Sequence, residues 1–328
     1  AGPKVIKYLN KKQIGEEIRN EGPNSHRKKS GTPTMGGIVI ILSTIIPTMI
    51  WAKLFNELVI IILFVVVWMA VIGFIDDYLK IIKKVPSGLI AKYKLMGQIS
   101  IGIIVVYFMN SSIIYNEVRT STSLPFVANG MIDFGMLYPL LIIFIITATS
   151  NAVNLTDGLD GLAAGLVAIS TLIFGGIAYV SGRVDFSGYL NIQYIEGSGE
   201  LFIFCLSMVG ACIGFLWFNA HPAKVFMGDT GSLSLGAALG TLSILLKKEI
   251  LLSIIGGVFV FETISVLIQV GYYKYTKRKY GKGKKVFKMA PIHHHFELLG
   301  WHENHVVVRF WIVGVMLALI SLTTFKIQ

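Results

Sequence analysis

Long apolar runs separated by short polar segments dominate the pattern of the chain. A helix needs about 20 apolar residues to cross the hydrocarbon core of a bilayer, or somewhat fewer when its polar flanks extend toward water. Nine runs meet this requirement, at residues 36–52, 57–75, 95–109, 134–150, 159–180, 200–218, 231–246, 250–273 and 306–325. The pattern predicts an all-α polytopic membrane protein with nine transmembrane helices in a single membrane domain, residues 1–328.

The run at 231–246 is short and rich in small residues. Small side chains let helix backbones approach one another closely inside a membrane protein. We therefore expect this run to form a tightly packed helix. Its small residues are Gly231, Ser232, Ser234, Gly236, Ala237, Ala238 and Gly240.

Lysine and arginine are distributed unevenly between the two sets of alternating loops. Loops on the N-terminal side carry 22 of these residues and loops on the other side carry 6. Positive residues accumulate on the cytoplasmic side of membrane proteins, so the first set is expected in the cytoplasm. The cytoplasmic loops are then residues 1–35, 76–94, 151–158, 219–230 and 274–305.

Composition excludes several classes of protein. The chain is 54% hydrophobic and 14% charged, with a net charge of +11, and its mean hydropathy is +0.70. Soluble domains average about 25% charged residues, so a soluble globule, a disordered chain and a nucleic-acid-binding module are all excluded. Lysine and arginine on the cytoplasmic side account for most of the positive charge. The dense clusters at 27–29 and 274–288 leave a second interpretation open, in which they bind anionic lipid headgroups or an anionic substrate.

The longest outside loop, residues 110–133, contains β-branched residues and the turn pair Asn129-Gly130. Asn-Gly favours the tight turns that join antiparallel strands. The loop is therefore expected to form a short hairpin.

Acidic residues gather at the cytoplasmic ends of the predicted spans. Asp76-Asp77 follows the second run, Asp157 and Asp160 flank Gly158-Leu159, and Asp229 precedes the small-residue run. All seven histidines fall on the same side. Mg²⁺ usually binds one or two carboxylates together with substrate phosphates, and phosphoryl transfer depends on such positioning and charge neutralisation. The pattern indicates a phosphoryl-transfer site that holds a divalent cation.

Each acidic group has a simpler alternative. An acid at a helix end is often only solvated or placed near the helix dipole, and Asp157 could be an N-cap for the next helix. Asp157 and Asp160 share a face if they lie on one helix. Lys80, Lys83 and Lys84 could neutralise Asp76-Asp77 in place of a metal ion.

Three consecutive histidines, His293 to His295, lie in the most basic loop. Neighbouring side chains on a helix point apart and zinc-site spacings are absent, so contacts with an anion or a base are favoured over zinc. Glu262 is the one acid well inside an apolar run, where it is either functional or hydrogen-bonded to a neighbouring helix. Arg309 is its candidate partner.

At these motifs the chain resembles the phospho-N-acetylmuramoyl-pentapeptide transferase family, within the polyprenyl-phosphate N-acetylhexosamine-1-phosphate transferase superfamily. The resemblance covers essentially the whole chain. The aspartate motifs fit the superfamily, and the histidine segment points to the muramoyl-pentapeptide branch. The segments that carry it are Gly31 to Gly37, Asp76-Asp77, Asn151 to Gly161, Phe226 to Asp229 and Ala290 to Glu297.

The resemblance implies transfer of phospho-N-acetylmuramoyl-pentapeptide from its UDP-linked donor (UDP-MurNAc-pentapeptide) to undecaprenyl phosphate, which gives lipid I and UMP for peptidoglycan synthesis. It also implies Mg²⁺, ten transmembrane helices, a homodimer, and a cytoplasmic active site in the bacterial inner membrane. Two mechanisms remain open, namely direct attack by the lipid phosphate and a covalent phosphosugar–aspartate intermediate. The opening Ala1-Gly2-Pro3 resembles the end of the family's first helix, so most of that helix is expected to lie outside this sequence.

The resemblance also suggests roles by position. Asp229 resembles a metal-ligating aspartate. Asp76 resembles the candidate base that deprotonates the lipid phosphate, and Asp77 lies beside it in the sequence. All three aspartates are candidate metal ligands, and together with His293 they are the candidate catalytic residues. Gly158, Leu159 and Phe226 resemble the uracil pocket. The full set of candidate substrate-binding residues is Lys29, Thr34, Lys92, Lys94, Asn154, Asp157, Gly158, Leu159, Asp160, Phe226, His294 and His295.

Three alternative functions are kept. A UDP-N-acetylglucosamine-1-phosphate polyprenyl-phosphate transferase shares the aspartate motifs, although the histidine segment argues against it. A CDP-alcohol phosphotransferase shares the start of the Asp157 motif, but Gly165 stands where that family has arginine. A cation-coupled transporter would depend chiefly on Glu262. Transporters place their polar sites near the bilayer midplane and often contain inverted repeats. Here the acidic residues gather at one surface and no repeat is visible, which argues against a transporter.

Overall fold

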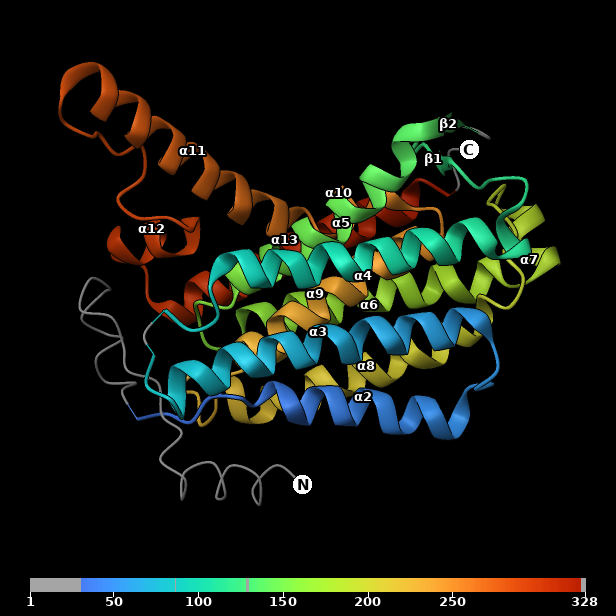
Figure 1. The fold of residues 1–328 in the computed structure, drawn as a ribbon, viewed down its shortest axis with the longest axis horizontal. Helices are drawn as coiled ribbons and strands as arrows, with labels where there is room; N and C mark the ends of the chain where they lie inside the picture. Colours follow the sequence, from blue (N-terminus) through green and yellow to red (C-terminus); the bar gives the residue numbers. More distant parts are fainter. Residues whose placement is uncertain (1–30, 86, 128–129, 326–328) are drawn as a thin grey trace.

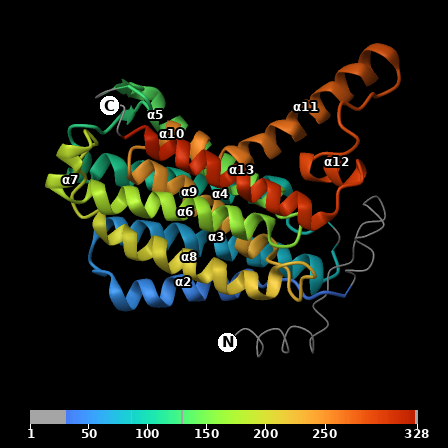
Figure 2. The same cartoon turned by 180° about the vertical axis from the view of Figure 1, so that it is seen from behind.

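The computed structural model describes residues 31–85, 87–127 and 130–325, which form a bundle of long helices (Figures 1 and 2). The helices are α2 (Gly37–Trp51), α3 (Glu57–Ile81), α4 (Ala91–Ser111), α5 (Tyr138–Thr156), α6 (Leu162–Ser181), α7 (Val184–Tyr189), α8 (Gly199–Asn219), α9 (Gly228–Leu245), α10 (Glu249–Ile255), α11 (Gly257–Tyr280), α12 (Ile292–Leu298) and α13 (Glu303–Thr323). Short 3-10 turns, η2 (Ile113–Tyr115) and η3 (Gly135–Leu137), lie between α4 and α5.

The predicted hairpin is present. Strands β1 (Ser121–Ser123) and β2 (Met131–Asp133) pair in antiparallel orientation, with Thr122 opposite Ile132. They lie at the same end of the bundle as α7 (Figure 1).

Every predicted run forms helix, which confirms the all-α polytopic class. Six helices of the described chain are long and apolar enough to cross a membrane, or seven if the bent pair α10–α11 is one span. The predicted count of nine is therefore not reached by this measure. Helix α2 has only 15 residues, and small polar residues dilute α9, which is not among the six.

The run at 250–273 is not one straight span, which corrects the prediction. Helices α10 and α11 meet at Gly256-Gly257 with a bend of 85°. Paired glycines supply neither side-chain packing nor helix propensity, and sharp kinks commonly occur at such positions. Beyond the bend, α11 leaves the bundle and projects past α12 (Figures 1 and 2).

Helix α9 lies at the centre of the bundle and contacts α2, α3, α5, α6 and α10. All residues from Thr230 to Leu245 are buried. A Cβ added at Gly236 would overlap the backbone of Thr149 on α5. The tight packing predicted from the small residues is confirmed, because glycine allows these two backbones to touch.

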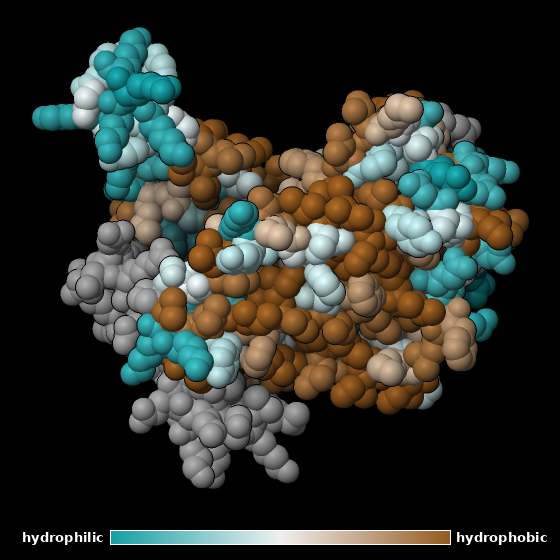
Figure 3. Space-filling view, in the orientation of Figure 1, coloured by the Kyte–Doolittle hydropathy of each residue, from teal (hydrophilic) through white to brown (hydrophobic). Residues whose placement is uncertain are grey.

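The outer surface of the bundle is apolar. Brown side chains cover the flank seen in Figure 3, while hydrophilic residues gather at the projecting end of α11 and at the opposite end of the bundle. Large exposed apolar side chains include Trp51, Phe144 and Trp217, which are 75%, 67% and 83% exposed. An apolar belt between two polar ends is the surface expected of a multi-pass membrane protein.

Candidate active site

Glycine positions the two aspartates of α3. The helix continues through Asp76 and Asp77 to Ile81, beyond the predicted run. One turn earlier, a Cβ on Gly73 would overlap the backbone of Asp229. The absence of a side chain lets α3 lie directly against the first turn of α9, and this contact brings the two aspartate motifs together.

Asp77 caps the N-terminus of α9 from the neighbouring helix. Its Oδ1 accepts a hydrogen bond from the backbone N–H of Asp229 at 3.0 Å, and its Oδ2 accepts from the N–H and hydroxyl of Thr230 at 2.9 and 2.6 Å. The first N–H groups of a helix lack partners within the helix, and an aspartate is a favoured cap. Both oxygens of Asp77 are therefore engaged in holding α9 to α3.

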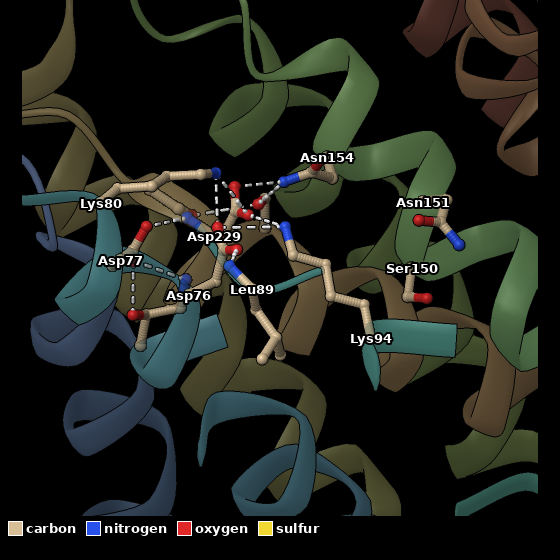
Figure 4. A network of polar contacts seen from close by, with 12 residues as sticks. Asp76, Asp77, Lys80, Leu89, Lys94, Ser150, Asn151, Asn154 and Asp229 are labelled. Atoms are coloured by element: carbon tan, nitrogen blue, oxygen red, sulfur yellow. Dashed lines mark hydrogen bonds and ion pairs between the residues drawn. The ribbon is translucent and has the colours of Figure 1, made fainter. Parts of the chain in front are cut away.

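Asp76 and Asp229 share two lysines (Figure 4). The Lys94 ammonium lies 3.0 Å from Asp76 Oδ2 and 2.5 Å from Asp229 Oδ2. Lys80, one helical turn after Asp76, forms an ion pair with Asp76 Oδ2 and lies 3.1 Å from Asp229 Oδ2. Two ammonium groups thus bridge two carboxylates from α3 and α9. The backbone N–H of Leu89 donates to the other oxygen of Asp76 at 2.7 Å.

Asn154 completes the cluster from α5. Its side-chain amide donates to Asp229 Oδ1 and to the Ser232 hydroxyl, both at 2.8 Å. Earlier on α5, the Gln98 side chain of α4 donates to the Ser150 hydroxyl and accepts from the Asn151 amide, which ties α4 to α5. Four helices therefore fix the orientation of the Asp229 carboxylate.

The three carboxylates can hold a hard cation. One oxygen from each of Asp76, Asp77 and Asp229 falls within a group whose atoms all lie within 4.8 Å of one another. Asp76 Oδ2 is buried, and among the described residues its partners are the ammonium groups of Lys80 and Lys94. Oxygen-only ligands suit Mg²⁺. The residues therefore fit a divalent cation, which would be held chiefly by Asp76 and Asp229 because Asp77 is engaged with α9.

The histidine segment folds as the short helix α12 and is held against α11. The loop that leads to α12 is tied to α11, because the Gln269 side chain accepts from the backbone N–H groups of Val286 and Phe287, both at 3.0 Å. His293 and Glu262 are fully buried, and their Nδ1 and Oε2 atoms lie 3.1 Å apart. The prediction that Arg309 is the partner of Glu262 was wrong. The Arg309 guanidinium instead lies over the Trp301 ring, 4.0 Å from its centroid.

The prediction that neighbouring histidines diverge is also wrong for the first pair. The His293 and His294 rings lie 4.1 Å apart between centroids, and a Cβ at Gly158 would meet the Nε2 atoms of both. His295 differs, because its Nδ1 accepts from the backbone N–H of Lys288 at 3.1 Å. Glycine at position 158 thus leaves room for two imidazoles beside the α5–α6 turn.

Asp157 and Asp160 do not share a helical face. Asp157 ends α5, and its N–H bonds the carbonyls of Val153 and Asn154; it does not cap α6, which begins after Gly161. Asp160 Oδ2 lies 3.0 Å from His221 Nδ1. Glu303 Oε2 lies 3.4 Å from the same nitrogen, so a second cluster ties this turn to α13.

The remaining predicted residues occupy the margins of the site. Thr34 is buried beside Gly228, next to Asp77. Phe226 bonds the 33–36 segment through its backbone, with its N–H donating to Pro33 O. Leu159 is buried, Lys92 is exposed, and Lys29 lies outside the described residues.

Sequence reasoning omitted four side chains from its site: Lys80, Ser232, His221 and Glu303. Lys80 carried a usable signal, since it follows Asp76 by four residues on a helix and side chains at this spacing meet. Ser232 carried the same kind of signal, because it follows Asp229 by three residues on α9. His221 and Glu303 come into contact with Asp160 only through tertiary packing.

Comparison with known proteins agrees with this geometry. The Glycosyl transferase family 4 model matches residues 59–247, and Phospho-N-acetylmuramoyl-pentapeptide-transferase signature 1 matches residues 29–41. A phospho-N-acetylmuramoyl-pentapeptide-transferase of Chloroherpeton thalassium is 50% identical over 327 residues, covering 100% of this chain and 89% of the relative. Those of Chlorobaculum parvum and Chlorobium chlorochromatii are 48% and 49% identical, with the same coverage.

These matches favour neither the acetylglucosamine transferase nor the transporter. They extend over the whole chain and include both the aspartate site and the histidine segment. By its motifs, its fold and its relatives, this chain belongs to the phospho-N-acetylmuramoyl-pentapeptide-transferase family.

Proposed function

We propose that this protein transfers phospho-N-acetylmuramoyl-pentapeptide from the UDP-linked donor to undecaprenyl phosphate. A P–O–P bond forms between the lipid phosphate and the sugar-bound phosphorus, and the bond from that phosphorus to UMP breaks. The observation that carries the proposal is the cluster in which Lys80 and Lys94 bridge Asp76 and Asp229.

The two lysines suit a diphosphate. Both ammonium groups are partly exposed, with side-chain exposures of 36% for Lys80 and 20% for Lys94, so an incoming phosphate can reach them. Lysine binds phosphate as a compact, rotatable point charge. In the proposed complex the lysines turn from the carboxylates to the donor phosphates and neutralise charge as the leaving UMP forms.

Mg²⁺ is part of the proposal. When bound, it would neutralise the charge that builds up on the phosphate groups. Asp76 and Asp229 are the proposed ligands. Asn154 holds Asp229 in one orientation, and Asp77 keeps the helix that carries Asp229 against α3.

The histidine segment is proposed to contact the nucleotide-linked sugar. His294 lies beside Gly158 and bonds Glu297 at 2.8 Å through Nδ1, which leaves its Nε2 on the side of the α5–α6 turn. His293 lies deeper against Glu262. The basic end of α11 supports the same reading, because lysines there attract an anionic donor.

The proposed orientation puts this site on the cytoplasmic face of the bacterial inner membrane. The unequal distribution of lysine and arginine supports it, and the aspartates lie at the lysine-rich end of the bundle. A homodimer is proposed from the family resemblance alone.

Donor choice tests the function. The purified protein is given undecaprenyl phosphate and Mg²⁺ with either UDP-N-acetylmuramoyl-pentapeptide or UDP-N-acetylglucosamine, and UMP release is measured. We expect release with the first donor only. Release with the second donor only would move the chain to the acetylglucosamine branch, and would contradict the proposed substrate while leaving the phosphoryl-transfer site intact.

A further inference from the structure

A cavity of about 430 Å³ lies at the end of the bundle opposite the aspartate cluster. Its walls come from the hairpin, from α7 with the loop after it, and from the turn between α9 and α10, elements that Figure 1 places far from α12. Ser123, Ser187 and Lys248 form a buried polar floor, exposed by 9%, 3% and 3%. Gly188 and Tyr194 lie at an exposed mouth.

The Lys248 ammonium on this floor is only partly satisfied. Within the described part of the chain it makes one hydrogen bond, to the Ser123 hydroxyl at 2.9 Å, and no ion pair. It also lies 5.8 Å from the centroid of the Phe325 ring. An ammonium has three donors, so two remain for another partner, and a buried charge is costly unless it is paired.

The neighbouring charges do not balance it. Lys247 is fully buried, and its ammonium donates to the Arg119 carbonyl at 3.0 Å and to the Tyr138 hydroxyl at 2.8 Å. The Glu249 carboxylate accepts from Thr122 and Tyr138, one bond to each oxygen. Two ammonium groups thus accompany one carboxylate whose oxygens are already engaged.

Burial lowers the pKa of Lys248 to about 8, against the opposing effect of Glu249. The side chain therefore stays mostly protonated at neutral pH. The Ser123 and Ser187 hydroxyls donate to the backbone carbonyls of Lys247 and Val184, so the spare donors belong to Lys248. A positive charge with spare donors at the base of an open cavity favours an anion with several acceptor oxygens.

We propose that this cavity binds the phosphate group of an anionic ligand through Lys248, on the face of the membrane opposite the active site. The ligand is a phosphate ester, either a phospholipid headgroup or a soluble compound. The volume admits a phosphate carrying a glycerol-sized group, and the mouth opens beside the polar end of the bundle. Nothing in this proposal depends on the transferase function.

Native mass spectrometry of the purified protein tests the proposal with two probes, phosphatidylglycerol and sn-glycerol 3-phosphate. We expect saturable binding of at least one probe, weakened at least tenfold in Lys248→Met. Lys53→Met is the matched control and should bind normally, because this lysine is 84% exposed in the loop before α3. Binding of phosphatidylglycerol alone assigns the lipid source, and binding of glycerol 3-phosphate assigns a soluble one.

A second variant keeps the test independent of folding defects at Lys248. Gly188 lines the mouth, and a Cβ there meets nothing within 4 Å, so Gly188→Trp should fold and obstruct entry while Lys248 remains. It too should weaken binding at least tenfold. Binding of neither probe, or binding that survives both Lys248→Met and Gly188→Trp, would overturn the proposal.

Discussion

Lys80 and Lys94 each contact both Asp76 and Asp229, so removing one ammonium alters the balance of the whole cluster. Lys94→Met should lower kcat/KM for the UDP-linked donor by about 10- to 100-fold, since a hydrogen bond to a charged group contributes about 1.5–3 kcal/mol. The exposed Lys83→Met is the matched control. Steady-state UMP release measures both variants, and equal activities would show that Lys94 does not bind the donor.

Glu262 and His293 form a fully buried pair whose members should act as a unit. We expect Glu262→Gln and His293→Asn each to reduce kcat/KM, and the double variant to lose less than the product of the single losses. Contacting residues couple by about 0.5–3 kcal/mol. A double-mutant cycle on kcat/KM measures this coupling. A double variant whose fold loss equals the product of the two single losses would mean that Glu262 does not position His293.

At the level of residues, sequence reasoning found the aspartates because they occur as motifs at the ends of apolar runs. It failed where two distant segments meet. His221 and Glu303 join Asp160 only after α8 and α13 have packed, and Glu262 was paired with Arg309 rather than with His293. Side-chain partners depend on helix rotation and tilt, which hydropathy does not encode.

At the scale of the helices, Gly73 should decide whether α3 can pack against α9. A Cβ at this position would overlap the Asp229 backbone, whereas a Cβ at Gly210 on α8 meets nothing within 4 Å. Gly73→Ala should lower the thermal unfolding temperature, since overpacking costs about 1–3 kcal/mol. Gly210→Ala should be neutral or slightly stabilising, because alanine favours helix. A scan in detergent compares them, and equal unfolding temperatures would refute close α3–α9 packing.

Helix existence was predictable and helix ends were not. The predicted run at 57–75 stops where the charged residues begin, yet α3 continues to Ile81, because helical hydrogen bonds persist where polar side chains reach water. The 85° bend at Gly256-Gly257 was missed for a related reason. Both halves of the run are apolar, and a hydropathy pattern does not show where the helix axis changes direction.

At the scale of the whole molecule, the lysine distribution predicts that Lys83 faces the cytoplasm and Lys53 the opposite side. Single cysteines at these positions can be labelled with a membrane-impermeant maleimide in intact spheroplasts. We expect Lys53→Cys to react at once and Lys83→Cys only after permeabilisation. The native Cys205 and Cys212 are buried, so they should contribute little background. The reverse pattern would invert the proposed orientation.

The central claim is that the Asp229 cluster is a cation-dependent phosphoryl-transfer site. The most direct test is UMP release from UDP-N-acetylmuramoyl-pentapeptide and undecaprenyl phosphate, measured with and without Mg²⁺ for the unmodified protein, Asp229→Asn and the control Asp133→Asn. Asp133 lies in β2 at the other end of the bundle. We expect Mg²⁺-dependent release that Asp229→Asn reduces at least 100-fold and Asp133→Asn leaves unchanged. Undiminished release by a folded Asp229→Asn, or release that persists in excess chelator, would contradict the account.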